Sequence, residues 1–174
     1  MMDGYLLDTN IISVLANPRN SRHTDFMQKV QRLEHIWLPV VAIAEIEFGM
    51  AKADKLDETQ RDEIRRFFRE YPQHLGIGDN TVEPYALLRA QLWTMHASRQ
   101  TRGHKEKLPE ELFDRVTGKH LGIDERDLFI ASVAAENGLI LATNDSNAGM
   151  KRIAEAAQKL QEAGKAVNLQ ISFW

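Results

Sequence analysis

The 174-residue sequence contains no cysteine. This absence excludes disulfide bonds, zinc sites built on thiolates, and cysteine nucleophiles. Any metal ion bound here must therefore be held by oxygen or imidazole ligands. A chain of this length can bury about two thirds of the surface that its unfolded form exposes, so it needs no covalent crosslink. We expect one domain over residues 1–174, in a reducing compartment.

Long apolar runs are also missing. The longest, Ile36–Ala44, is far shorter than the ~20 residues of a membrane-spanning helix. The N-terminus has no charged region followed by a long apolar core, which a secretory signal would require. These two absences predict a cytoplasmic protein with no membrane partner.

Positive charge is not in excess, because 22 Lys and Arg face 25 Asp and Glu, a formal net charge of −3. A nucleic acid would therefore have to bind a local patch of the surface. The best candidate is the charge-rich segment Gln100–Ile123, which is either a long loop or contains a short helix around Pro109–Val116. Within it, Arg102, His104 and Lys105 are candidates for contact with phosphate.

What the sequence does contain is a regular alternation of strand-like and helical segments, without internal repeats or Pro/Gly-rich linkers. Such alternation predicts an α/β fold, a three-layer sandwich with a five-stranded, mainly parallel sheet. The expected strands are Tyr5–Asp8, Ile36–Val40, His74–Ile77, Leu139–Thr143 and Ala166–Ile171. The expected helices are Ile11–Ala16, Thr24–Leu33, Val41–Ala53, Glu58–Tyr71, Val82–Arg99, Glu125–Asn137 and Lys151–Ala163.

The first expected strand ends on a polar run, Asp8-Thr9-Asn10. Ligands of open parallel sheets bind at the carboxyl ends of the strands, so acids at those positions are candidates for chemistry. Asp8 is explained equally well as the cap of a helix that begins at Ile11 or as a rigid carboxylate ligand for a metal ion. This stretch alone leaves both interpretations open.

A second strand end carries a similar polar run. The stretch LILATND places Asp145 just after the fourth expected strand, with Thr143 and Asn144 before it. Because the carboxyl ends of parallel strands meet at one edge of a sheet, we expect Asp145 and Asp8 to lie on the same edge.

The helix after the second strand contains two acids, in the stretch VVAIAEIEFG. Glu45 and Glu47 lie roughly 200° apart around a helix, so they cannot serve one site. Gly49 leaves room one turn beyond Glu45, and Ala51 gives Glu47 similar room. Geometry alone therefore does not choose between these two glutamates.

Two more acids begin the stretch IDERDLFIASVAAENG. Asp124 has the position of a helix N-cap, and Asp127 lies in the first turn, where the helix dipole favours acids in any protein. Asp127 is distinguished by the apolar run Leu128–Ala131 directly after it, which fits a helix packed tightly on the sheet. That packing would fix the carboxylate of Asp127, which makes it the better candidate for a functional acid.

Carboxylates that converge on one cleft repel one another and raise their own pKa values unless a cation neutralises them. We therefore expect Mg²⁺ or Mn²⁺, which are hard ions that take oxygen ligands. Such an ion polarises a phosphate and lowers the pKa of a bound water. Hydrolysis of phosphodiesters follows from that chemistry, without a cysteine or a Ser-His pair.

Three stretches of the chain, LLDTNIIS, AEIEFG and DLFIASVAAENGLILATND, resemble in order and spacing those of the PIN-domain ribonucleases. The resemblance covers nearly the whole chain and is strongest to the toxin subunits of bacterial VapBC toxin–antitoxin modules. It implies a PIN-like five-stranded parallel sheet and a Mg²⁺- or Mn²⁺-dependent endoribonuclease that cleaves RNA. It also implies an antitoxin protein that keeps the enzyme inactive, contact with DNA only through that antitoxin, and a homodimer.

The resemblance also assigns residues. The acids that match the catalytic positions of the family are Asp8, Glu45, Asp127 and Asp145. The metal ligands among them are Asp8 and Asp127, and the match selects Glu45 over Glu47. The polar residues expected to support them are Thr9, Asn10, Thr143 and Asn144. The chain departs from the family in its longer Gln100–Ile123 segment and in Met150, which stands nearest to an expected phenylalanine.

Two other functions would require different residues at the same positions. A phosphatase with an aspartate nucleophile would need a second aspartate two residues after Asp8, where the chain has Asn10. A phospho-acceptor signalling domain would need a lysine at a late strand end, and ATND has none. A PIN fold that binds RNA or a partner without cleavage is compatible with all four acids. The six histidines have no i,i+4 spacing, so a zinc site is not expected.

Overall fold

Five parallel strands form the centre of the computed structural model, in the order β3-β2-β1-β4-β5. The structure describes residues 4–53, 57–97, 108–114, 116–145 and 148–174. Leu6 of β1 is in register with Trp37 of β2 on one side and Leu141 of β4 on the other. The expected five-stranded sheet is confirmed, and every strand pair is parallel. The strands are β1 (Tyr5–Leu7), β2 (Ile36–Pro39), β3 (His74–Leu75), β4 (Ile140–Thr143) and β5 (Gln170–Phe173).

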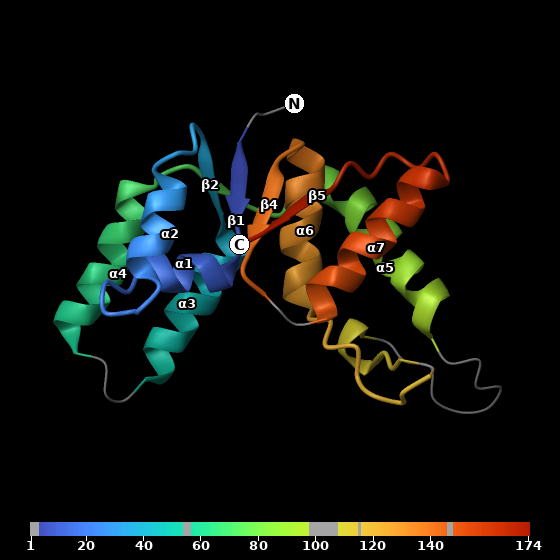
Figure 1. The fold of residues 1–174 in the computed structure, drawn as a ribbon, viewed down its shortest axis with the longest axis horizontal. Coiled ribbons are helices and arrows are strands. Elements are labelled where there is room, and N and C mark those ends of the chain that lie inside the picture. The colour runs from blue at the N-terminus through green and yellow to red at the C-terminus, as the bar shows by residue number, and fades with distance from the viewer. Residues whose placement is uncertain (1–3, 54–56, 98–107, 115, 146–147) are drawn as a thin grey trace.

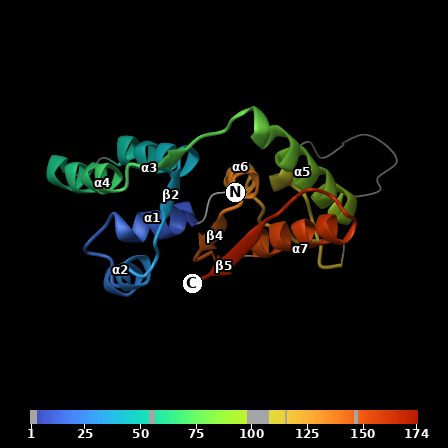
Figure 2. The same ribbon diagram turned by 90° about the horizontal axis from the view of Figure 1, so that it is seen from above.

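Helices pack around this sheet in two groups. Figure 1 shows α1 to α4 on the side of β2, and α5 to α7 on the side of β4 and β5. In Figure 2, α3 and α4 lie on the opposite side of β2 from α1 and α2, which gives the layered α/β architecture. The α-helices are α1 (Thr9–Leu15), α2 (His23–Val30), α3 (Val40–Lys52), α4 (Glu58–Glu70), α5 (Val82–His96), α6 (Glu125–Asn137) and α7 (Ala148–Glu162). Two 3₁₀ turns are η1 (Asp79–Thr81) and η2 (Pro109–Glu111).

Among the helices of the described ranges, none combines the length and the apolar character that a membrane span requires.

The direction of the strand order reverses between β1 and β4. The chain first builds β1, β2 and β3 outward in one direction, and then returns to place β4 on the free side of β1. In open parallel sheets, the crevice at the carboxyl ends of the two strands that flank such a reversal is the usual ligand site. Asp8 directly follows β1, and Asp145 lies two residues after β4. Asp8 and Asp145 therefore lie at the usual ligand site of this type of fold.

The core lies between the strands and the apolar faces of the helices. Leu6 and Leu7 of β1 and Leu141 and Ala142 of β4 are completely buried, as expected for strands covered on both faces. Along α6, the buried residues begin at Leu128, directly after Asp127. The predicted packing of this helix is confirmed, and it fixes the backbone that carries Asp127.

Several element boundaries differ from the predicted ones. Helix α2 ends at Val30 and strand β3 at Leu75, where the sequence predicts Leu33 and Ile77. Helix α1 begins at Thr9 because Asp8 caps it, and α7 begins three residues before Lys151. The last strand begins at Gln170, although the sequence predicts Ala166. Residues before it form a turn, in which the N–H of Lys165 donates to the carbonyl of Leu160 and the N–H of Val167 to that of Lys165. The buried Val167 and Leu169 therefore fill the core from outside a strand.

The described part of the long segment between α5 and α6 is attached to the rest of the fold. Glu110, in the short helix η2, accepts a hydrogen bond from the N–H of Glu125 at 2.8 Å. Arg152 of α7 donates to the carbonyl of Leu121. A Cβ placed on Gly149 would lie 2.1 Å from the carbonyl oxygen of Gly122, so α7 approaches this segment more closely than any side chain permits. The segment is therefore packed against the first turn of α7.

Candidate active site

Asp8 is held by hydrogen bonds at the junction of β1 and α1. One carboxylate oxygen accepts from the N–H of Thr9 at 2.7 Å, and the other accepts from Oγ1 of Thr143 at 2.7 Å. The residue is only 1% exposed. Burial raises the pKa of Asp8, the two hydrogen bonds lower it again in part, and the nearby Asp145 and Glu45 add to the rise. The two interpretations of Asp8 are compatible, because the side chain caps α1 and also faces β4.

Thr143 connects the ends of the two central strands. It is the last residue of β4 and is completely buried. Its hydroxyl donates to Asp8 and also accepts a hydrogen bond from the N–H of Asp145 at 3.0 Å. One threonine therefore orients the first carboxylate and positions the backbone that carries the second.

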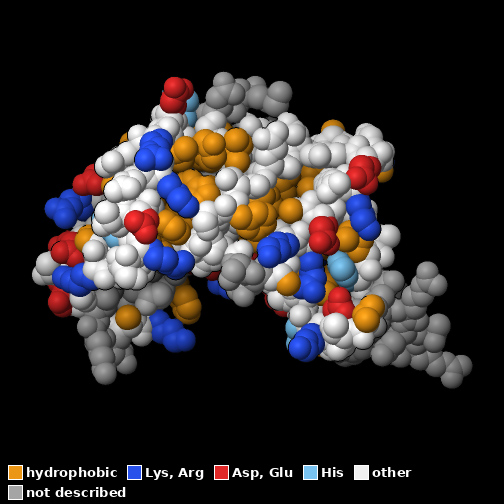
Figure 3. All heavy atoms as spheres, viewed as in Figure 1, with side chains coloured by type: hydrophobic (Ala, Val, Ile, Leu, Met, Phe, Trp, Pro, Cys, Tyr) orange, Lys and Arg blue, Asp and Glu red, His pale blue; other side chains and the backbone are white. Residues whose placement is uncertain are grey.

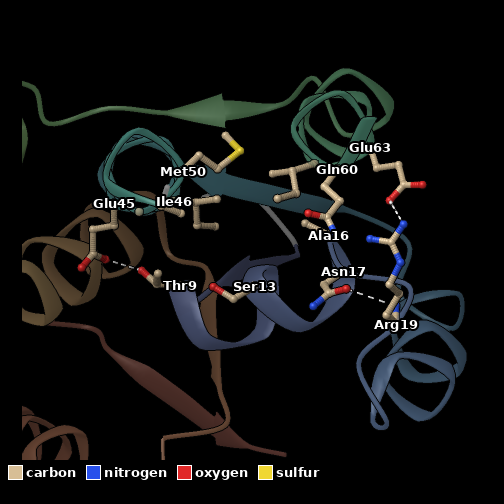
Figure 4. A pocket seen from close by; sticks show the side chains of 13 residues that line it. Thr9, Ser13, Ala16, Asn17, Arg19, Glu45, Ile46, Met50, Gln60 and Glu63 are labelled. Atoms are coloured by element: carbon tan, nitrogen blue, oxygen red, sulfur yellow. Dashed lines mark hydrogen bonds and ion pairs between the residues drawn. The ribbon is translucent and has the colours of Figure 1, made fainter. Parts of the chain in front are cut away.

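Glu45 reaches the same region from α3. Its Oε2 accepts a hydrogen bond from Oγ1 of Thr9 at 2.5 Å, and its Oε1 forms an ion pair with Arg126 at 2.6 Å. Figure 4 shows the carboxylate of Glu45 directed at Thr9. Glu47 instead accepts two hydrogen bonds from Arg65 of α4, at 3.0 and 2.9 Å. The structure thus places Glu45, and not Glu47, beside Asp8.

Asp127 occupies the first turn of α6, where Asp124 caps the helix by accepting from the N–H of Arg126 at 2.8 Å. Burial raises the pKa of Asp127 to about 7, and the negative charges of Asp8, Asp124, Asp145 and Glu45 contribute in that order. All four predicted acids therefore lie within electrostatic reach of one another. A pKa this high marks a buried carboxyl that also has negative charges near it.

Arg126 is a member of this cluster that the sequence did not reveal. Its guanidinium bonds to Asp124 and also forms the ion pair with Glu45, so it joins α6 to α3. The only signal in the sequence is its place between acids in DERD. Which acid it contacts depends on the approach of α3, which no local pattern predicts. Arg126 partly neutralises the acids from within the chain.

The donors present suit a hard divalent cation in type and charge, because they are carboxylates. Burial and, after it, the charge of the neighbouring acids raise the pKa values of Asp8 and Asp127. Within the described ranges, however, no three carboxylate or imidazole groups are gathered closely enough to hold a metal ion. Glu45 is turned toward Arg126. A metal ion would therefore draw side chains of this cluster together.

The other polar residues predicted to support the acids, Asn10 and Asn144, form no hydrogen bond to them among the contacts described. Asn10 is exposed in the first turn of α1. The amide of Asn144, oriented so that its hydrogen bonds are satisfied, donates to the carbonyl of Trp174 at 2.9 Å and accepts from Arg22. Asn144 therefore fixes the end of β5 to α2. The three candidates for phosphate contact, Arg102, His104 and Lys105, lie outside the described residues.

Two pockets flank the acids. The larger, of 510 Å³, begins at Thr9 and Glu45 and runs between α1, α3 and α4 toward the ion pair of Arg19 with Glu63, as Figure 4 shows. The smaller, of 220 Å³, begins at Thr143 and Asp145 on the other side. Figure 3 shows the outline of the molecule hollowed between the lower parts of the two helix groups. Of the four acids, Glu45 thus borders the larger pocket and Asp145 the smaller one.

The sequence is similar to that of known proteins. A family model described as PIN domain matches residues 5–156. Ribonuclease VapC14 of Mycobacterium tuberculosis is 35% identical over 65 residues, which are 37% of this chain. The aligned region spans 62% of that curated relative, less than two thirds of its length.

Solved structures agree in fold. VapBC2 from Rickettsia felis, bound to a DNA fragment from its promoter, superposes with a TM-score of 0.60 and 19% identity, over 99% of both chains. FitAcB from Neisseria gonorrhoeae superposes with a TM-score of 0.59 and 19% identity, over 86% of this chain and 93% of the other. At such identities the likeness establishes the fold alone.

Proposed function

This chain belongs to the PIN domain family, and on that premise we propose that it is a Mg²⁺- or Mn²⁺-dependent endoribonuclease, the toxin of a toxin–antitoxin module. The observation that carries the proposal is the cluster of Asp8, Glu45, Asp127 and Asp145 at the reversal of strand order, where burial and the charge of the neighbouring acids raise the pKa of Asp127 to about 7. The relative named Ribonuclease VapC14 supports RNA as the substrate.

The residues that would hold the metal ion are Asp8 and Asp127, with Asp145 at the end of the neighbouring strand. When bound, the ion would polarise the scissile phosphate and lower the pKa of a water molecule. Its positive charge would also favour the deprotonated form of Asp127. These roles require only oxygen ligands, which is consistent with a chain that lacks cysteine.

The chain's own residues prepare the site before substrate arrives. Thr143 and the N–H of Thr9 fix both oxygens of Asp8, so this carboxylate loses little further freedom on binding. Arg126 and the hydroxyl of Thr9 hold Glu45 at the rim of the cluster. There, Glu45 is placed to accept a proton from a water molecule that attacks the phosphorus.

Cleavage of RNA by the purified, partner-free protein tests this proposal. We expect structured or single-stranded RNA to be cut internally in Mg²⁺ or Mn²⁺ and to remain intact in EDTA. Cleavage that persists in EDTA would contradict the metal-dependent mechanism. Release of phosphate from small esters without RNA cleavage would instead indicate the phosphatase, although the exposed Asn10 occupies the position where its general acid would be needed.

We assign two protein partners to the same function. The first is an antitoxin that covers the site and contacts DNA. The similarity in fold to VapBC structures that were solved with bound DNA supports this assignment. A small gene beside this one, encoding a DNA-binding protein with a flexible tail, is the observation expected for it.

The second partner is another copy of the chain. Val40 and Phe48 lie about two turns apart on α3 and are 46% and 66% exposed. Exposed apolar side chains that lie near one another mark surfaces at which proteins associate. We expect the free protein to sediment as a dimer and Phe48→Asp to sediment as a monomer. Val116, which is 94% exposed, supplies the control Val116→Asp, which is expected to remain dimeric. A monomeric wild-type protein would contradict the assignment.

A further inference from the structure

The smaller pocket, on the β5 side of the acids, has features that the reaction described above does not use. Its 220 Å³ are lined by Thr143, Asn144, Asp145, Lys151, Phe173 and Trp174. It shares Thr143 and Asp145 with the acid cluster, so any group bound in it lies next to the reacting phosphate. A cation and an exposed aromatic ring, the two elements that bind single-stranded nucleic acid, are both in its wall.

Lys151 supplies the cation. It is exposed in α7, and no ion pair joins it to any residue within the described ranges, even though Asp145 lines the same pocket. Arg126, by comparison, is fully engaged by acids. The ammonium group of Lys151 is therefore available to an anion that enters the pocket.

Phe173 supplies the ring. Phe173 is the last residue of β5, and Trp174, which follows the strand, makes different contacts. Trp174 packs edge-on against Phe26 at 5.9 Å, with the ammonium of Lys29 at 5.5 Å from its ring, and serves the packing of α2. Phe173 is 47% exposed. Its ring offers a face on which a base can stack.

The polar amide in the wall is already occupied. Asn144 uses its amide for Trp174 and Arg22, so it has little capacity to read the edge of a base. A base bound here would be held by stacking, which every base permits. Figure 3 shows Lys and Arg side chains over α2 and around the beginning of α7, on either side of the end of β5, where a phosphate backbone would pass.

We propose that this pocket, the β5 subsite (Asn144, Asp145, Lys151 and Phe173), binds the nucleotide next to the scissile phosphate in single-stranded RNA. The base stacks on Phe173, and Lys151 neutralises the adjoining phosphate. The proposal rests on the ribonuclease function and adds to it the conformation of the substrate. A base that must leave its helix to stack on Phe173 is available in loops and unpaired strands, so the subsite selects unpaired RNA.

Binding of a labelled single-stranded RNA oligonucleotide, measured by fluorescence anisotropy, tests the role of Lys151. The measurements use the full-length Asp8→Asn variant in EDTA, so that no cleavage occurs. We expect Lys151→Gln to weaken binding and to reduce the slope of log affinity against log salt by about 0.7, the value for one phosphate contact to a single strand. Lys159→Gln, the same charge change two turns along α7 at another exposed position, is the matched control and should leave the slope unchanged.

The role of Phe173 has a different signature in the same assay. We expect Phe173→Leu to weaken binding by roughly 5- to 100-fold without a change in the salt slope, because stacking is lost and no charge is removed. Phe173→Trp should restore affinity. Phe113→Leu, at another exposed phenylalanine, is the control for a general loss of apolar surface. In cleavage assays, the two subsite variants should raise KM and leave kcat nearly unchanged.

The outcomes separate the subsite from the ribonuclease function. If RNA is cleaved but Lys151→Gln and Phe173→Leu behave like their controls in both affinity and KM, the subsite is wrong and the ribonuclease function stands. If RNA is bound in the expected way but is never cleaved, the ribonuclease function is wrong and the subsite stands. If the oligonucleotide does not bind, or a duplex binds as tightly as the single strand, the subsite is overturned.

Discussion

Asp8→Asn is expected to lower kcat/KM for RNA cleavage at least about 100-fold, because loss of a partner that merely supports a metal ligand already costs 10- to 100-fold. The fold should persist. Asn caps helices as well as Asp does, and its oxygen can still accept the hydrogen bond from Thr143 or from the N–H of Thr9. Rates measured with Mg²⁺ and RNA, together with far-UV circular dichroism, check both parts of this expectation.

Two further variants make this result interpretable. Asp25→Asn removes an exposed acid from the first turn of α2 and should retain full activity. Asp145→Asn changes a less buried member of the cluster, so it distinguishes lost chemistry from lost structure if Asp8→Asn is poorly folded. Full activity of a well-folded Asp8→Asn variant would rule out the proposed site.

Asp127→Asn is expected to stabilise the protein, and more so at pH 8 than at pH 5. The pKa of Asp127 rises from 3.8 to about 7 on folding, so the folded state binds more protons than the unfolded state between these values. The stability of the wild-type protein therefore falls as the pH rises from about 4 to about 7, and levels off above. Asparagine does not titrate in this range, so the variant does not lose this stability as the pH rises. Because Asp127 is partly exposed, we expect a gain of only ~1 to 3 kcal/mol at pH 8.

Urea unfolding in EDTA at several pH values gives the free energy of unfolding of the variant and of the wild type. The contributions of other titrating groups largely cancel in the difference between the two. The difference should shrink as the pH falls from 7 toward 4. Equal stability of the two proteins at pH 8 would contradict the raised pKa of Asp127. Added Mg²⁺ should narrow the difference by stabilising the wild-type protein alone, since a ligand of the native state raises its stability.

Local signals in the sequence account for the elements that were predicted well. Helix α6 runs from Glu125 to Asn137 as expected, because both of its ends are encoded nearby. Asp124 caps the first turn, and Gly138, with a φ of 67°, adopts the left-handed conformation that ends helices. The order of the acids along the chain likewise follows from strand ends and helix starts.

Features that depend on distant parts of the chain were not predictable in the same way. The pairing of Arg126 with Glu45 requires that α3 meet α6, and the alternation of strands and helices does not specify that contact. Nothing in the sequence distinguishes Lys151 from other surface lysines, because only the position of β5 in the fold places Phe173 in the same pocket. The start of β5 was misplaced because Val167 and Leu169 are buried by a turn, which has the same apolar pattern as a strand.

The close approach of Gly149 to Gly122 has a consequence for how this chain can vary. It clamps the connection between α5 and α6 just before Asp124, the cap of the helix that carries Asp127. The structural effect of insertions or deletions nearer to α5 therefore stops at this contact, and the acids are not displaced. The length of this connection can thus change as an independent module, while the cluster of acids stays in place.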